Sequence, residues 1–171
     1  MASETMTACY VKVEMGFVVQ GSDGAQLVKT HTYQRTFSDG SGAEQAQTVW
    51  NDDARPLNAT SETLDLDGLV DFKGATMSDN TGVRVLLVEN LSTADRLTVG
   101  GGDWSGTAQM LTGSTDKINI GAGGLLLWVK PGTSGDTSKG TITATSADGL
   151  TFNSGSDATG NYKIALVLTN T

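Results

Sequence analysis

Two residues of this chain have the chemistry for nucleophilic catalysis: Cys9 as a thiolate and His31 as its base. Each is the only residue of its type in the sequence, which excludes an intrachain disulfide and the usual Cys/His zinc sets. Cys9 falls in the apolar phase of an alternating segment, where a free cysteine is usually a small buried hydrophobe. His31 lies on a strand-like segment, where a surface or interface position is expected. We therefore predict no catalytic residue and a protein that is not an enzyme.

Carboxylates offer a second kind of chemistry, because Ca²⁺ takes six to eight oxygen ligands. Asp52 and Asp53, together with Asp65 and Asp67, are the best candidates, but the segment around Asp65 matches only a fragment of a calcium loop. Strand alternation also places Asp65 and Asp67 on a polar face, where solvated side chains belong. A glycosidase would need two carboxylates across a cleft, and no pair is singled out. The prediction is no metal and no cofactor.

Two glycine clusters, at 100–102 and 121–124, invite comparison with phosphate-binding loops. Neither precedes a predicted helix, and neither carries the Lys-Ser/Thr ending of a P-loop, so the amide cradle and the helix dipole are missing. We interpret both clusters as turns or bulges.

Large aromatic side chains leave three interpretations open. Trp50 begins a polar strand segment and Trp104 lies in a loop rich in Gly and Ser. Each ring could cap the core, anchor a subunit interface, or stack on a sugar. Trp128 lies inside an apolar run and is expected to be core.

Length, hydropathy and net charge limit the classes of protein to which this chain can belong. The 171 residues suffice for one domain with its own core. No apolar segment is long enough to cross a membrane and no secretory leader is apparent, so we expect a soluble product of the cytoplasm and no membrane partner. The formal net charge of −8 argues against nucleic acid as a partner, since binding to phosphates needs a basic patch.

Hydrophobic patterning predicts an all-β chain of about 9–10 short strands. Gly121–Pro131 contains five large apolar residues in a row, which predicts a central strand covered on both faces, with Val83–Asn90 as its neighbour or facing partner. Tyr162–Thr169 is a third apolar strand. The spacing of strands and turns is typical of an antiparallel β-sandwich or jelly roll.

The N-terminal part differs from the rest. Cys9–Val19 alternates, Gly21–Gly24 is a turn, and Ala25–Phe37 is a second extended run, so the two runs are predicted to pair as a hairpin. The second run is polar on much of both faces, which favours a sheet edge or a contact with another subunit. The prediction is a single domain over 1–171, with a hairpin at 1–38 as an assembly arm, a connection at Ser38–Gln47 that is flexible at Ser38–Ala43, and a jelly-roll-like core at 47–171.

From Trp50 onward the chain resembles small β-rich virion proteins encoded among the structural genes of tailed bacteriophages. Each segment that carries the resemblance is a strand with its turn, and none contains a catalytic or ligand-binding motif. In chain order they are Trp50–Asp53, Ser61–Leu66, Val85–Ser92, Leu97–Gly101, Ile120–Leu127, Asp148–Gly155 and Tyr162–Ile164.

The resemblance implies a capsid decoration (cement) protein on the exterior of a virion, made in the host cytoplasm. It also implies a homotrimer that contacts the major capsid protein. Two alternatives stay open: a tail- or fibre-associated virion protein, and a carbohydrate-binding β-sandwich module. The candidate interface residues are Tyr33, Phe37, Trp50 and Trp104.

Overall fold

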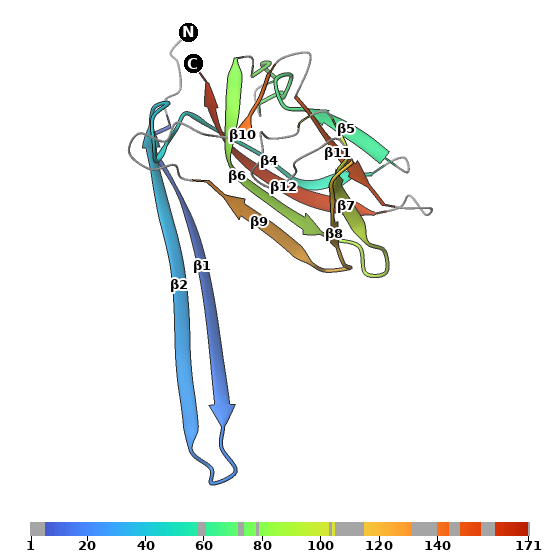
Figure 1. Ribbon diagram of the computed structural model, residues 1–171. Coiled ribbons are helices and arrows are strands. Elements are labelled where there is room, and N and C mark those ends of the chain that lie inside the picture. The colour runs from blue at the N-terminus through green and yellow to red at the C-terminus, as the bar shows by residue number, and fades with distance from the viewer. Residues whose placement is uncertain are drawn as a thin grey trace.

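A computed structural model gives the structure of the protein. It describes residues 6–57, 61–71, 74–77, 79–102, 104, 115–130, 140–143, 148–154 and 160–170. Within these residues the chain is all-β, without a helix, and its sheets pack as an antiparallel β-sandwich with a long hairpin projecting from it (Figure 1). The strands are β1 (Ala8–Gln20), β2 (Gln26–Asp39), β3 (Gln45–Ala46), β4 (Thr48–Pro56), β5 (Ser61–Asp65), β6 (Asn80–Asn90), β7 (Leu97–Gly100), β8 (Lys117–Ile120), β9 (Leu125–Val129), β10 (Gly140–Thr141), β11 (Gly149–Asn153) and β12 (Asn161–Asn170).

Two sheets form the sandwich. The five-stranded sheet has the order β10-β6-β12-β4, with β9 also paired to β6, and the four-stranded sheet has the order β5-β11-β7-β8. Every pairing in the two sheets is antiparallel. The strongly apolar β6 and β12 pair with each other and each has a further neighbour, so they occupy the middle of the five-stranded sheet, as their composition predicts.

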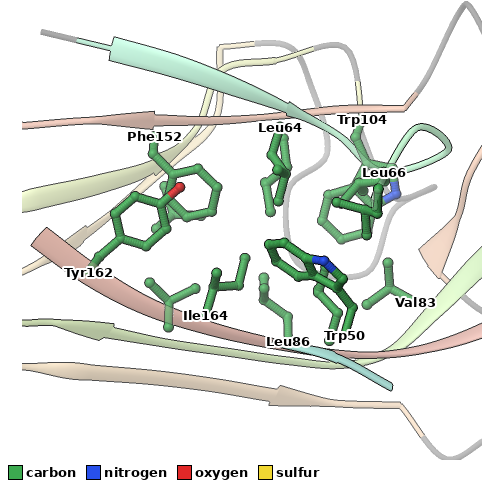
Figure 2. Close-up of a cluster of buried hydrophobic side chains, with 14 of the residues drawn as sticks. Trp50, Leu64, Leu66, Val83, Leu86, Trp104, Phe152, Tyr162 and Ile164 are labelled. Atoms are coloured by element: carbon green, nitrogen blue, oxygen red, sulfur yellow. The ribbon is translucent and has the colours of Figure 1, made fainter. Parts of the chain in front are cut away.

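The main core fills the space between the two sheets. Figure 2 shows Phe152 and Leu64 from one sheet facing Tyr162 and Ile164 from the other. Phe152 and Tyr162 stack with their ring centroids 4.4 Å apart. Alternation along β6 and β12 sends one set of side chains into this core and leaves the other set on the face that points away from the four-stranded sheet. We call that second face the outer face.

The structure corrects the predicted role of residues 125–129. They form β9 as predicted, and β6 is its neighbour, but among the described residues β9 has no strand on its other side. Leu125 is 61% exposed, and the four residues that follow are half-buried. A run of apolar residues therefore indicated burial without distinguishing a central strand from an edge strand that is covered by other parts of the chain.

Two strands differ from what their sequences predict. The polar Asn51-Asp52-Asp53 predicts an interruption of the strand at 47–57, but β4 is continuous there, with an irregularity in its pairing to β12 opposite this point. Residues 141–145 are predicted to form a strand, of which the structure describes the short β10, and residues 144–147 lie outside the described residues. The connection at 38–47 contains β3, which pairs in parallel with the end of β2. Most of the loops predicted at 103–114 and 132–139 also lie outside the described residues.

Candidate functional site

The hairpin of β1 and β2 is the candidate functional site, because it projects from the sandwich and exposes apolar side chains that the protein's own core does not bury. Its strands pair in continuous antiparallel register from Ala8 opposite Ser38 to Gln20 opposite Gln26. This confirms the predicted hairpin. At about 3.4 Å per residue the paired strands are roughly 40 Å long. Most of this length extends away from the sandwich, and we call the hairpin the arm (Figure 1).

One face of the arm is apolar along most of its length. The register brings the odd-numbered residues of both strands to this face, so the apolar sets of β1 and β2 coincide. Beyond the sandwich these side chains are exposed: 59% for Met15, 54% for Val19 and 50% for Leu27. We call this region the distal stripe. Its residues are Val13, Met15, Phe17, Val19, Leu27 and Tyr33.

Nearer the sandwich, the same face of the arm is buried. Phe37 is fully buried and clusters with Ala46 of β3 and with Val85 and Val167, which lie on the outer face of the five-stranded sheet. Cys9 is partly buried and packs against this arm base cluster. The remaining partly buried members are Met6, Val11, Leu127 and Val129. The distal stripe is thus the continuation of a surface that already packs against a sheet.

A buried arginine fixes the loop at the arm base. Arg84 lies in β6 where the pairing with β12 shifts by one residue, and its side chain is fully buried. It donates to the carbonyl oxygen of Gly42 at 2.7 Å and to that of Gln45 at 3.2 Å. Hydrogen bonds from a charged donor are stronger than neutral ones, so these contacts tie the arm to the centre of the sheet.

Charge is unevenly divided between the two faces of the arm. The apolar face carries Lys29, His31 and Arg35 and, between Cys9 and Phe37, no carboxylate. Arg35 lies over the ring of Tyr33 at 5.2 Å, and His31 stacks with Phe17 at 5.9 Å.

The opposite face holds the ion pair of Lys12 and Glu14, at 2.9 Å. The face that carries the distal stripe is therefore also cationic, whereas the opposite face, which exposes Val18 and Val28, has balanced charge.

The four candidate interface residues occupy different environments. Tyr33 is 39% exposed on the arm, whereas Phe37 is buried in the arm base cluster. Trp50 belongs to the main core, and its Nε1 donates to the carbonyl oxygen of Val70 at 2.9 Å. Trp104 is 3% exposed and packs edge-on against Trp128. Of the four, Tyr33 is the one whose side chain is available to a partner in this structure.

The sequence analysis did not select the most exposed residues of the distal stripe. Met15, Val19 and Leu27 lie in the alternating pattern that predicted the hairpin. The signal that could have identified them is the coincidence of the apolar faces of two strands across one turn.

The register keeps the two candidate catalytic residues apart. Cys9 lies opposite Phe37 and His31 lies opposite Met15, so six residues, or about 20 Å, separate them along the arm. Partial burial raises the pKa of the Cys9 thiol, which lowers its thiolate fraction at neutral pH. His31 is therefore too far away to act as the base for this thiol.

The candidate metal ligands have structural roles. The carboxylate of Asp65 accepts hydrogen bonds from the backbone N–H groups of Asp67 and Gly68, at 3.0 and 2.9 Å, and so closes a turn. Asp52 pairs with Arg55 at 3.5 Å. Within the described residues, no three His, Cys, Asp or Glu side chains are placed to hold a metal ion.

The glycine cluster at 121–124 forms a turn, as predicted, whereas the cluster at 100–102 ends β7. Gly100 and Gly101 both have positive φ, and so does Gly123 in the turn that connects β8 to β9. That turn is closed by a hydrogen bond from the N–H of Gly124 to the carbonyl oxygen of Gly121 at 2.9 Å. Backbone of this kind favours glycine because it lacks a Cβ.

One polar cluster was not anticipated. The hydroxyl of Tyr162 donates to Glu62, and Nε of Arg55 lies 3.2 Å from both oxygens of the same carboxylate. Burial, followed by the hydrogen bond and the charge of Glu62, raises the pKa of Tyr162. Burial lowers the pKa of Arg55, but the charges of Glu62, Tyr162 and Asp52 and the hydrogen bond to Glu62 together outweigh it, and the net shift is upward. The cluster joins β4, β5 and β12 at one end of the sandwich and is structural.

No family model, no curated protein and no solved structure matches this chain. The described residues contain no helix that is long and apolar enough to cross a membrane.

Proposed function

We propose that this protein is a non-enzymatic structural protein of a tailed-phage virion, a capsid decoration protein whose arm binds a neighbouring subunit. The observation that carries the proposal is the distal stripe, an exposed apolar face on a projecting hairpin. A two-stranded hairpin is at best marginally stable in water. An exposed apolar patch with polar surroundings marks a site of protein–protein interaction. Both considerations favour an arm that is covered in an assembly.

The strand order of the sandwich supports the virion assignment. We infer that the sandwich is a jelly roll, because its pairings nest: β7 pairs with β8, β6 with β9, β5 with β11, and β4 with β12. Nested pairs of this kind arise when one long hairpin is wound around a core, with its strands divided between two sheets. Jelly rolls occur in viral capsid proteins and in lectins. This inference adds to the resemblance to β-rich phage virion proteins.

The lectin alternative depends on an accessible aromatic platform. Trp104 was the residue proposed to stack on a sugar, and its ring is buried against Trp128. The distal stripe, by contrast, is long, narrow and unsuited to a single sugar ring, but its shape suits a protein surface. The arm therefore favours the virion interpretation over a carbohydrate-binding module.

The protein would stabilise the capsid through many identical contacts, one set for each copy on the particle. A decoration protein on the capsid exterior, assembled as a homotrimer, adds contacts between copies of the major capsid protein. Each contact is weak, but linked contacts gain affinity from high effective concentration. The net charge of −8 keeps the protein from competing for DNA. Its role is to resist the pressure of the packaged genome.

Shortening the arm tests this function. Residues 14–32 are replaced by an Asn-Gly turn that joins Val13 to Tyr33, a pair opposite each other in the register. The arm base cluster stays intact, so the sandwich is expected to unfold at the same temperature as the wild type. We expect the shortened chain to lose binding to purified heads of the source phage. Normal binding to heads would refute the proposal, and binding to tails alone would place the protein on the tail.

A further inference from the structure

We propose that the distal stripe of one copy lies on the outer face of the five-stranded sheet of a second copy. This inference rests on the proposed function, since it names the partner of the arm. The partner is another molecule of this chain, and the contact joins two different surfaces. Contacts between unlike surfaces build rings when the rotation closes.

The acceptor is the part of the outer face beside the arm base cluster, and it shares Leu127 with that cluster. Leu125 and Val49, at its two edges, are 61% and 48% exposed. Between them lie Leu127, Leu87 and Ala165, which are adjacent in the register and half-buried. Alternation assigns all five to the outer face, because their neighbours in sequence point into the main core. These apolar residues lie on β9, β6, β12 and β4, and they share the face with Asn51 and with the ion pair of Glu89 and Lys163.

The arm base shows that the two surfaces are compatible. Phe37, from the apolar face of the arm, already packs on Val85 and Val167, which form one row of the outer face with Val49 of the acceptor. The distal stripe continues the apolar face of the arm, and the acceptor continues the outer face of the sheet. The arm leaves its own sheet at the cluster, so its stripe cannot reach its own acceptor. The acceptor of a second copy can therefore cover the stripe that one chain leaves exposed.

The dimensions of the two surfaces agree. From Val13 to Val19 the stripe is about 20 Å long, at 3.4 Å per residue. Four strands at a spacing of about 4.8 Å extend over roughly 15 Å between their outer backbones, and side chains add to this. One arm is therefore long enough to cross the acceptor from β9 to β4.

Charge favours this contact over packing of one arm on another. Two stripes placed face to face would bring Lys29 and Arg35 of one copy close to the same cations of the other. Residues 8–39 contain three basic and three acidic side chains, which leaves eight basic and sixteen acidic, a net charge of −8, for the rest of the chain. Glu89 lies opposite Leu125 in the register, and its side chain is 39% exposed although it pairs with Lys163 at 3.3 Å. A cationic stripe is thus attracted to the acidic body.

Photo-crosslinking of the full chain tests the contact. Benzoylphenylalanine is placed at Leu125 in the unlabelled chain, which is mixed with a ¹⁵N-labelled wild-type chain and irradiated. Trypsin releases the distal arm as the peptide Val13–Lys29, because it cleaves after Lys12 and Lys29. We expect the probe to capture the labelled form of this peptide. The same probe at Val70, which is 51% exposed and outside the outer face, is the matched control and should not capture it.

A substitution provides the second measurement. Leu125→Lys places a positive charge in the acceptor, opposite the cationic stripe, and we expect it to weaken self-association at least about tenfold, because it adds charge repulsion to the loss of an apolar contact. Val70→Lys should leave association unchanged. Absence of the arm crosslink, or unchanged association of Leu125→Lys, overturns the inference. If the arm is still needed for binding to heads, the proposed function survives that result; if the shortened arm binds heads normally, the proposed function fails with it.

Discussion

Replacing Phe37 with alanine should release the arm while leaving the sandwich folded. Phe37 is the largest fully buried side chain of the arm base cluster and is not part of the main core. Truncation of a buried phenylalanine costs about 3–5 kcal/mol. Since a two-stranded hairpin has little stability of its own, this loss falls on the attachment of the arm.

The expected effect on hydrogen exchange follows from that energy. Each 1.4 kcal/mol changes an equilibrium constant tenfold, so a loss of about 3 kcal/mol raises the open population of the arm base about a hundredfold. Backbone amides of Cys9, Val11 and Arg35 should therefore exchange about a hundred times faster in Phe37→Ala. Amides of the four-stranded sheet should keep their protection. Native-state exchange on a dilute sample, followed by mass spectrometry or NMR, measures both sets.

Leu64→Ala is the matched control, because Leu64 is buried in the main core between the sheets. Its loss of about 2–5 kcal/mol should accelerate exchange of the most protected amides in both sheets. If Phe37→Ala accelerated exchange in the four-stranded sheet as much as in the arm, the arm would not be a separately attached element, and the reasoning would fail.

Three further substitutions test the supporting contacts. Arg84→Met removes two charge-assisted hydrogen bonds to carbonyl oxygens of the arm base loop and should lower the free energy of unfolding by about 3 kcal/mol in urea. Tyr162 has a raised pKa, so above pH 10 the unfolded chain loses this proton while the folded chain keeps it. This group then removes up to about 1.4 kcal/mol of stability per pH unit, a loss that Tyr162→Phe should not show in urea titrations between pH 9 and 11. Gly102→Ala would place a Cβ 2.1 Å from the carbonyl oxygen of Gly149 and should lower the melting temperature through a cost of about 1–3 kcal/mol; an unchanged melting temperature would mean that the backbone adapts there.

Much of the fold follows from the sequence because strands leave a periodic signal. Alternation through Cys9–Val19 and a turn at Gly21–Gly24 specify both the hairpin and its register, since a shift of one residue would separate its two apolar faces. The apolar runs of β6 and β12 identify the strands in the middle of a sheet.

The remainder depends on contacts between distant residues. Nothing in its local sequence indicates that Arg84 reaches the carbonyl oxygens of Gly42 and Gln45, because that contact depends on a shift in strand pairing. The burial of Trp104 depends on Trp128, which comes from β9. Candidate interface residues were chosen by type, as aromatics, whereas exposure is decided by which parts of the alternating pattern the sandwich covers.

Cryo-electron microscopy of the assembled particle tests the central claim most directly, since it shows what the arm contacts. The account predicts that Met15, Val19 and Leu27, each at least half exposed in the isolated chain, are covered by a neighbouring subunit on the capsid exterior. A particle in which the arm extends into solvent with this face uncovered would contradict the account.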